Sequence, residues 1–444
     1  MNGDGRGGGT EDVGGEASRL PDPYEVRPLE RPPDTTVVLP GSKSLTNRAL
    51  VAAALATGTS TLTGALDADD TRAMRAGLRA LGVPIEVHDA GTRLEVVGVA
   101  GHPPVADPEV HVRLSGTTAR FLAPVLARVR GRSYLDGQDA FRRRPMGPAL
   151  VALRELGCTV TELGQPGHLP VTVSGGPIDG GSVAVAGEVS SQFLSGLLLL
   201  GPVLPAGLTV RLTTALVSEP YVTLTAEVLT AFGARLERVD ERTYHVPGTG
   251  YRARRYAIEP DASAASYLLA AAALTGGRVR IDGLGRTSRQ GDVAFAEVLG
   301  RMGAEVQLGS DHVEVVGTGR LRGIEVDLGA MSDTAQTLAA VAVAADGPTR
   351  ITGIGFIRAK ETDRIAAVVT ELTRLGIDAR EEPDGLLVHP GTPRPGVVAT
   401  YDDHRMAMSF ALLGLTTPGI RIADPGCVAK TFPGYFEVLE QLRR

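Results

Sequence analysis

The chain has 444 residues, a formal net charge of −6 and a pI near 5.8. Its length is typical of two or three domains, and its acidic balance argues against a general nucleic-acid or membrane binder, because such proteins carry a basic excess. Two cysteines, Cys158 and Cys427, are too few for a disulfide framework or a zinc site. We therefore expect a cytoplasmic protein without a metal, whose anion sites are built from locally gathered cations.

The first predicted segment, residues 1–20, is Gly-rich and acidic and offers little for a core to bury. We expect a disordered tail, because the segment lacks both the apolar stretch of a secretory signal and the arginines of a transit peptide. A short strand follows at residues 36–39. The longest apolar run, residues 193–204, contains Gly and Pro and is shorter than the run of about 20 residues that spans a bilayer. We predict that it is a buried helix.

A pattern of three parts repeats six times along the chain, and its third part precedes the turn glycine of the first part. Its first part is a turn glycine followed by a short β-branched strand. These glycines recur every 70 to 76 residues, by subtraction of successive positions, at Gly58, Gly131, Gly207, Gly277, Gly347 and Gly419. A period of this length is too long for a helical solenoid unit and favours globular domains of three repeats each.

The second part of the pattern is an amphipathic helix that ends at a glycine and is followed by two strands. A glycine just past a helix is the usual left-handed stop. The predicted stops are Gly82, Gly157, Gly233, Gly303 and Gly376. The sixth such helix, "YFEVLEQL", ends the chain without its strands, and the early strand at residues 36–39 could supply one from the other terminus.

The third part is an Ala/Leu-rich helix that is apolar on nearly all sides and therefore buried. Each of the six opens with the N-cap residues Ser, Thr or Asp, in the sequences "GSKSLTNRAL", "LSGTTARFL", "VSSQFLSGL", "DASAASYLL", "SDTAQTLAA" and "DDHRMAMSF". We expect one domain at 42–255 and a second at 21–41 plus 256–444, with hinges near 40–42 and 254–260. Six helix N-termini facing one cleft would attract anions, because free N–H groups and the helix dipole make them positive.

Three charged stretches go beyond what capping requires. Lys43 stands at a helix start where the dipole disfavours a cation, and Ser42 occupies the place of the glycine that a P-loop needs. "KETDR" predicts Lys360 and Arg364 as i, i+4 neighbours on one helix face, although a solvated helix start explains it equally well. "DDHRMAM" crowds His404 and Arg405 at one helix start, which favours an active-site role.

Eight motifs then occur in one order, "LPGSKSLTNRAL", "RRPM", "SSQFLS", "VSEPY", "QGD", "KETDR", "DDHRMAM" and "AKTFPGYF". In this combination the chain, from about Val37 to its end, resembles the 5-enolpyruvylshikimate-3-phosphate synthase family. The resemblance implies an α/β fold of two hinged domains, each an inside-out barrel of three βαβαββ-type units. It also implies no metal or organic cofactor. We expect a monomer with small-molecule substrates and no nucleic-acid or membrane partner.

The family's reaction moves the enolpyruvyl group of phosphoenolpyruvate onto the 5-hydroxyl of shikimate 3-phosphate. It releases phosphate through a tetrahedral addition–elimination intermediate and serves aromatic amino acid biosynthesis. Together the substrates carry two phosphates and two carboxylates, which accounts for many Lys and Arg in one site. Glyphosate is the family's known inhibitor at the phosphoenolpyruvate site. The sequence leaves the sensitivity of this chain to glyphosate open, and Gly116, Thr117 and Ala119 are the positions that bear on it.

Residue by residue, the resemblance implies that Lys43 contacts both substrates and that Gln192 lies between them. The residues implied for shikimate 3-phosphate are Ser44, Arg48, Ser190, Ser191 and Ser218. The residues implied for phosphoenolpyruvate are Gly116, Arg144, Arg364, Arg405 and Lys430. Asp333 resembles the proton acceptor and Glu361 the proton donor, with Lys360 on the substrate beside Asp333; Lys43 and Lys430 complete the catalytic set. His404 and Tyr221 are two further candidates.

The sequence also departs from the family pattern and leaves alternatives open. The family often has Asn just before the Gly-Thr of the second buried helix, and here Leu114 and Ser115 occupy that approach. Phe356 stands where some members have an Asn that binds substrate. The nearest alternative, UDP-N-acetylglucosamine enolpyruvyl transferase, usually has a Cys in the loop that here reads "GQDAFRRRPM". A non-catalytic anion-binding protein is the other alternative, although pure binding would not need both Asp333 and Glu361. A glutamate donor needs a raised pKa, which burial favours and neighbouring cations oppose.

Overall fold

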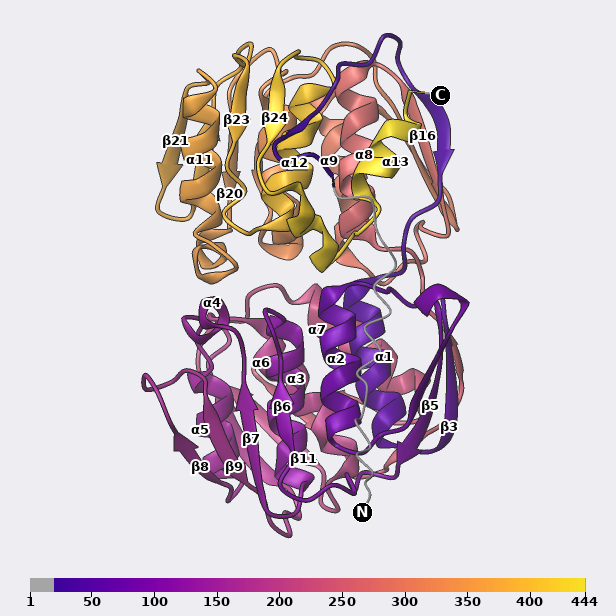
Figure 1. The fold of residues 1–444 in the computed structure, drawn as a ribbon, viewed down its shortest axis with the longest axis vertical. Helices are drawn as coiled ribbons and strands as arrows, with labels where there is room; N and C mark the ends of the chain where they lie inside the picture. Colours follow the sequence, from indigo (N-terminus) through magenta and orange to yellow (C-terminus); the bar gives the residue numbers. More distant parts are fainter. Residues whose placement is uncertain (1–19, 444) are drawn as a thin grey trace, which may run out of the picture.

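The computed structural model of the chain describes residues 20–443, so the predicted tail, apart from Leu20, lies outside the described residues. Figure 1 shows two lobes, one above the other along the longest axis. The core of the first lobe, purple and magenta, is built from residues between Leu45 and Ile258. The core of the second lobe, orange and yellow, combines residues between Val26 and Leu39 with residues between Ala262 and Leu442.

The first lobe contains three mixed sheets. One has the order β14-β3-β5-β4, with β15 also paired to β3: β14 (Tyr251–Arg252), β3 (Ala56–Thr63), β5 (Arg93–Val99), β4 (Ile85–His88) and β15 (Arg255–Ala257). The next has the order β6-β7-β9-β8: β6 (Glu109–His111), β7 (Arg132–Asp136), β9 (Val171–Ser174) and β8 (Thr159–Glu162). The third has the order β10-β11-β13-β12: β10 (Gly181–Val185), β11 (Leu208–Leu212), β13 (Thr243–Val246) and β12 (Glu237–Arg238).

The second lobe contains the other three sheets. One has the order β17-β18-β16-β2: β17 (Glu305–Leu308), β18 (His312–Val316), β16 (Arg278–Asp282) and β2 (Asp34–Val37). The next has the order β19-β20-β22-β21: β19 (Glu325–Asp327), β20 (Thr349–Thr352), β22 (Gly385–Val388) and β21 (Ala379–Glu382). The last has the order β1-β24-β23: β1 (Tyr24–Glu25), β24 (Ile420–Ile422) and β23 (Gly396–Val398).

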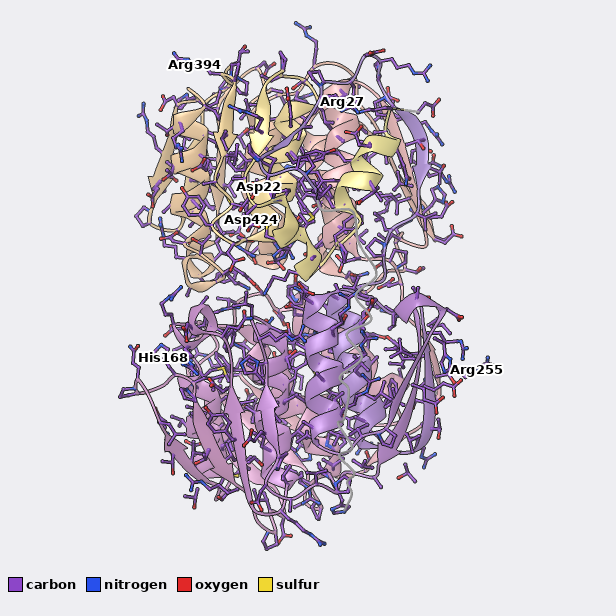
Figure 2. All side chains as sticks on the ribbon, in the orientation of Figure 1. Asp22, Arg27, His168, Arg255, Arg394 and Asp424 are labelled. Carbon is purple, nitrogen blue, oxygen red and sulfur yellow. The ribbon has the colours of Figure 1, made fainter. Side chains whose placement is uncertain are left out.

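The expectation that the early strand completes the last sheet is wrong. Strand β2 pairs in parallel with β16 and so belongs to the sheet of β16, β17 and β18 instead of the last sheet. A shorter segment, β1, instead pairs antiparallel with β24, and the side chain of Asp22 accepts a hydrogen bond from the backbone N–H of Asp424 at 2.9 Å (Figure 2). The period-2 pattern of a strand does not encode its partner, because the partner is set by tertiary packing.

Two sets of helices accompany the sheets. The Ala/Leu-rich set is almost wholly buried: α1 (Lys43–Leu55), α3 (Gly116–Val125), α6 (Ser191–Leu200), α8 (Ala262–Thr275), α10 (Ala335–Ala342) and α12 (His404–Gly414). The other set is α2 (Asp69–Ala80), α5 (Gly147–Glu155), α7 (Pro220–Ala231), α9 (Phe295–Met302), α11 (Arg364–Arg374) and α13 (Tyr435–Gln441). A short helix, α4 (Asp139–Arg142), occupies part of the segment that the sequence predicted as a loop.

The predicted helix stops are confirmed. The five glycines after α2, α5, α7, α9 and α11 all adopt φ between 83° and 113°, a region that costs glycine little. At the start of α1, Ser42 is the N-cap and accepts a hydrogen bond from the N–H of Leu45 at 3.4 Å. The side chain of Ser44 is therefore not needed for capping.

The two chain segments that cross between the lobes run side by side. Gly41 and Pro260 form an isolated bridge, the N–H of Ser42 donates to the carbonyl of Glu259 at 2.9 Å, and the N–H of Asp261 donates to the carbonyl of Pro40 at 2.9 Å. Within residues 20–443, none of the helices combines the length and the hydropathy that crossing a membrane would require.

Candidate active site

A cavity between the lobes is lined by charged side chains from both. Its walls are Lys43, Asp70, Gly116, Thr117, Arg144, Gln192, Asp333, Lys360, Glu361, Arg364, His404 and Arg405. Many of these residues stand in the first turns of α1, α2, α3, α6, α11 and α12, so several helix N-termini meet at one place. That arrangement is suited to anions, since both the helix dipoles and the side-chain cations are positive there.

Arg364 is the centre of the charge network in the second lobe. Its side chain is 2% exposed and contacts three carboxylates, with Nε 2.7 Å from Oδ2 of Asp403, Nη2 2.8 Å from Oε2 of Glu361 and Nη1 3.2 Å from Oδ1 of Asp333. Despite its burial, these carboxylates raise the pKa of the guanidinium. Arg364 thus holds both members of the candidate acid/base pair in place.

Asp333 receives hydrogen bonds from both lobes. Nη2 of Arg405 lies 2.6 Å from its Oδ2, and the phenol of Tyr221, in the first lobe, donates to Oδ2 at 3.1 Å. Burial by itself would raise the pKa of Asp333, but Arg405, Lys360, Arg364 and Lys43 hold it well below its usual range. Asp333 is therefore ionised in this arrangement, as a proton acceptor must be.

Glu361 is the other carboxylate at the cavity wall. Besides Arg364, it lies 3.7 Å from Nη1 of Arg144 and 3.9 Å from Nζ of Lys430. Burial raises the pKa of Glu361, but these three cations outweigh it and hold the pKa well below its usual range. The sequence left open whether burial or the neighbouring cations set the pKa of Glu361. With the cavity carboxylates as the only anions present, the cations dominate.

Lys360 lies at the end of a 3-10 segment, residues 355–359, and Arg364 is the first residue of α11. The prediction that the two are i, i+4 neighbours on one helix face is therefore wrong, although both line the cavity. Burial lowers the pKa of Lys360 to about 8, partly offset by Asp333. Its Nζ lies 5.8 Å from the ring centre of Phe356, so the unusual aromatic residue contacts the lysine through its π-face.

Gly116 is explained by its neighbour Arg144. A Cβ placed on Gly116 would lie 3.0 Å from Nη2 of Arg144, so a larger residue would displace the guanidinium. Gln192 is fixed by Thr117 and by Arg120, a residue that sequence reasoning missed. Nη1 of Arg120 donates to Oε1 of Gln192 at 2.8 Å, and Nε2 of Gln192 donates to Oγ1 of Thr117 at 3.3 Å. The three candidates therefore stand on one wall in a defined geometry.

The candidates for shikimate 3-phosphate are more dispersed. Ser190 caps α6 by accepting from the N–H of Gln192 at 3.3 Å, with Ser191 buried beside it. Ser44 lines two small cavities next to Asp261 and Ser263. Ser218 lines a wider, more open cavity, together with Phe356. The φ of Ser218, 54°, orients the turn before α7. Its buried Oγ has no hydrogen-bond partner among the described residues.

Arg48, a further candidate, is bound by the protein itself. It donates to Oγ1 of Thr225 at 2.9 Å, to the carbonyl of Tyr221 at 3.0 Å and to the carbonyl of Ser44 at 3.0 Å. Its side chain is 1% exposed. In this arrangement Arg48 fixes the backbone around Ser44 and Tyr221.

The two further candidates differ in their contacts. Tyr221 hydrogen-bonds Asp333, as described above. His404 is 1% exposed and lines the cavity, and neither ring nitrogen has a hydrogen-bond partner among residues 20–443. Burial and the charge of Arg405 hold the pKa of His404 well below its usual value, so the imidazole is neutral.

Asp70 is a second residue at this site that sequence reasoning missed. Its carboxylate lies 3.3 Å from Nζ of Lys430 and 3.7 Å from Nζ of Lys43. In the sequence it belongs to "DADDTR", which reads as an ordinary acidic helix start. Lys430 also donates to the backbone carbonyl of Leu114 at 2.8 Å. Because this contact uses the backbone, it does not depend on the side chain at position 114.

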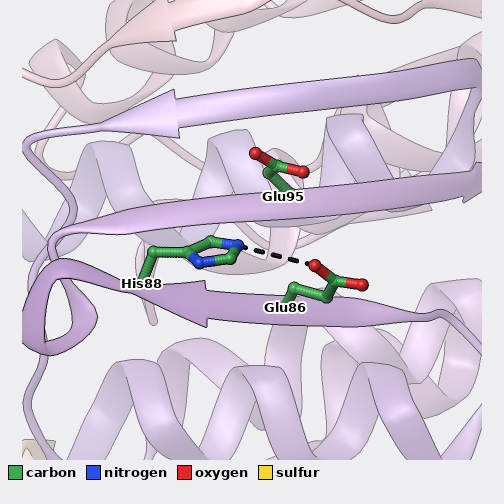
Figure 3. Close-up of side chains that lie close together, drawn as sticks. All are labelled: Glu86, His88 and Glu95. Atoms are coloured by element: carbon green, nitrogen blue, oxygen red, sulfur yellow. Dashed lines mark ion pairs between the residues drawn. The ribbon is translucent and has the colours of Figure 1, made fainter.

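A cluster of potential metal ligands lies on the surface of the first lobe. Glu86, His88 and Glu95 project from β4 and β5 with ligand atoms within 4.8 Å of one another (Figure 3). Glu86 is 76% exposed, and Glu95 is paired with Arg93 at 2.9 Å. An exposed pair of carboxylates on a strand face is common without a metal, so we assign no function to this cluster.

Comparison with known proteins agrees with the geometry. The family EPSP synthase (3-phosphoshikimate 1-carboxyvinyltransferase) matches residues 31–439. A protein of Nostoc sp. strain PCC 7120 named 3-phosphoshikimate 1-carboxyvinyltransferase is 44% identical over 416 residues, 94% of this chain and 98% of that protein. One of the same name from Bordetella petrii is 43% identical over 431 residues, 94% of this chain and 96% of that protein.

Solved structures give the same result. An EPSP synthase from Acinetobacter baumannii superposes with a TM-score of 0.79 at 27% identity, covering 94% of this chain and 97% of that one. The enolpyruvyl transferase NikO from Streptomyces tendae shares the fold, with a TM-score of 0.74 at 23% identity. With nearly the whole chain matched in sequence and in three dimensions, this chain belongs to the EPSP synthase (3-phosphoshikimate 1-carboxyvinyltransferase) family.

Proposed function

We propose that this chain transfers the enolpyruvyl group of phosphoenolpyruvate to the 5-hydroxyl of shikimate 3-phosphate and releases phosphate, in aromatic amino acid biosynthesis. The observation that carries the proposal is the convergence of Asp333 and Glu361 on one interlobe cavity, both joined to Arg364. A pure anion binder would need the cations but not two precisely held carboxylates. The reaction, in contrast, needs one proton acceptor and one proton donor.

The cations at the cavity match the charge of phosphoenolpyruvate. Arg144, Arg364, Arg405 and Lys430 bind its carboxylate and phosphate, and Lys43 contacts both substrates. Guanidinium groups suit this role because they make paired, charge-assisted hydrogen bonds to carboxylates and phosphates. Shikimate 3-phosphate is held by Lys360, Ser44, Arg48, Ser190, Ser191 and Ser218, and Gln192 lies between the two substrates.

The addition step uses both carboxylates. Asp333 accepts the proton of the 5-hydroxyl while the hydroxyl oxygen bonds to C2 of phosphoenolpyruvate. Glu361 delivers a proton to the methylene carbon. The product is a tetrahedral intermediate. In the elimination step the methyl group returns a proton to the Glu361 carboxylate, the C2–O bond to phosphate breaks, and the departing phosphate takes the proton held by Asp333. No metal or organic cofactor is needed, because every proton has a side chain to carry it.

Substrate binding raises the pKa of Glu361, as its role as proton donor requires. Its low pKa is caused by Arg364, Arg144 and Lys430, which are also the proposed ligands of phosphoenolpyruvate. Once the anionic substrate neutralises these cations, burial becomes the dominant effect and the pKa of Glu361 rises. The donor is then protonated only when its substrate is present.

We also propose the architecture that the repeats imply. The first domain comprises residues 42–255 and the second comprises 21–41 plus 256–444, with hinges near 40–42 and 254–260; each is an inside-out barrel of three units. The two buried cores, the six sheets and the paired crossings at Gly41 and Pro260 support this division. We further propose that the protein acts as a monomer in the cytoplasm.

The test is a coupled assay of phosphate release with shikimate 3-phosphate and phosphoenolpyruvate. We expect turnover with this pair and none when UDP-N-acetylglucosamine replaces shikimate 3-phosphate. Turnover with the UDP-sugar alone would favour the related enolpyruvyl transferase. Binding of both anions without phosphate release would favour the non-catalytic alternative.

A further inference from the structure

The side chain of Asp70 is nearly inaccessible, although it stands at the start of a helix. Its carboxylate is 5% exposed, and its backbone carbonyl accepts hydrogen bonds from Oγ1 of Thr118 at 3.3 Å and from Oγ of Ser115 at 3.5 Å. Helix α2 is thereby attached to the first turn of α3. The position of Asp70 is fixed by the backbone and does not depend on its carboxylate.

The carboxylate is not required for capping. In the first turn of α2, Oγ1 of Thr71 accepts a hydrogen bond from the N–H of Ala68 at 3.1 Å and donates to the carbonyl of Leu66 at 2.7 Å. The Asp70 carboxylate instead points to the cavity, whose wall it forms. A buried carboxylate is costly unless it is paired, and its net contribution to stability is small compared with an apolar group of the same size.

Two lysines share this one carboxylate. Oδ2 lies 3.7 Å from Nζ of Lys43, and Oδ1 lies 3.3 Å from Nζ of Lys430. Lys43 belongs to the first lobe, like Asp70, whereas Lys430 comes from the second lobe and reaches across to the carbonyl of Leu114 at 2.8 Å. Asp70 is therefore the common anchor of two cations from opposite sides of the cleft.

We propose that Asp70 is a positioning residue of the transfer reaction, which holds the ammonium groups of Lys43 and Lys430 where the anionic phosphoenolpyruvate meets both. The inference rests on the proposed function. Two long, flexible side chains of like charge would otherwise separate, and Arg144 and Arg364 nearby would add to the repulsion. Because Asp70 sets their spacing before the substrate arrives, less of the binding energy is spent on ordering the site.

The test compares Asp70→Asn with Asp69→Asn in steady-state phosphate release. Asparagine keeps the shape of Asp70 and removes its charge, whereas Asp69, its neighbour on α2, is 49% exposed and paired with Arg72. We expect Asp70→Asn to lower kcat/KM for phosphoenolpyruvate by about 10- to 100-fold, the size of effect that misplaced catalytic groups produce. Asp69→Asn should stay within about twofold of the unsubstituted protein.

A purely structural role makes a different prediction. If Asp70 had only a structural role, its loss would change the KM values of both substrates alike. Loss of positioning should instead raise KM for phosphoenolpyruvate more than KM for shikimate 3-phosphate, because Lys430 is assigned to phosphoenolpyruvate alone. Asp70→Glu restores the charge and should recover part of the lost kcat/KM. If Asp70→Asn does not fold, Asp70→Glu decides the question by the same comparison of the two KM values.

The outcomes separate the two proposals. No phosphate release by the unsubstituted protein would overturn the proposed function and this inference with it. Normal release together with unchanged kinetic constants in Asp70→Asn would overturn only the role of Asp70. An equal loss for both substrates that Asp70→Glu does not reverse would also reject positioning.

Discussion

Arg405 and Asp333 form a buried ion pair, with 2.6 Å between Nη2 and Oδ2. One partner is the proposed ligand of phosphoenolpyruvate and the other is the proposed proton acceptor. An anionic substrate that draws Arg405 to itself would therefore weaken the contact that makes Asp333 a poor base. In this way the counter-ions of the cavity couple substrate binding to the readiness of the catalytic carboxylates.

Replacement of Asp333 by Asn should separate catalysis from binding. We expect kcat to fall by about 100-fold or more, the usual size of a general-base contribution, while KM for phosphoenolpyruvate stays level or decreases because Arg405 and Arg364 lose a competing anion. Steady-state kinetics measure both, with the exposed Asp346→Asn as control. Near-normal kcat would remove Asp333 from the mechanism.

Glu361→Gln tests the proton donor. We expect kcat to fall by about 100-fold or more, since the amide cannot deliver a proton. KM for phosphoenolpyruvate should not increase, because the substitution releases Arg144 and Lys430 from an ion pair. Glu297→Gln, an exposed position on α9, serves as the matched control. A variant with raised KM and unchanged kcat would indicate a binding role instead.

The pH dependence of shikimate 3-phosphate utilisation should reflect Lys360. Burial lowers its pKa to about 8, so the ammonium loses its proton as the pH rises through that value. We expect kcat/KM for shikimate 3-phosphate, which reports the free enzyme, to decrease above about pH 8. In Lys360→Arg this decrease should move to higher pH by a unit or more, since a guanidinium stays protonated. An identical alkaline limb in both proteins would assign it to another group.

Arg364 should matter for stability as well as for binding. Arg364→Met leaves Asp403, Glu361 and Asp333 without their common cation, and breaking a buried ion pair from one side costs about 3–5 kcal/mol. Arg380→Met removes an exposed pair, 67% and 51% accessible, and should cost no more than about 1 kcal/mol. Urea unfolding compares the two. A cost for Arg364→Met no larger than that control would mean that the three carboxylates find other partners.

Much of the local structure could be predicted from the sequence alone. The strands after five of the six turn glycines were predicted correctly, whereas Gly58 lies inside β3. These strands and the left-handed helix stops at residues such as Gly82 and Gly376 depend on neighbouring residues, whose φ preferences and apolar periodicity are local properties. The charged helix starts also predicted residues of the candidate active site. Lys43, Arg364 and Arg405 indeed line one cavity, because each stands in the first turn of a helix that begins there.

The tertiary structure alone decided what depends on partners far apart in the chain. It paired β2 with β16 rather than with the last sheet, separated Lys360 from the face of α11, and brought Asp70 between Lys43 and Lys430, which is 360 positions away along the chain. The ionisation of Glu361 belongs to the same class, since its pKa is set by cations from both lobes. Local sequence patterns specify helices and strands. Strand partners and side-chain pKa values depend instead on residues from the whole folded molecule.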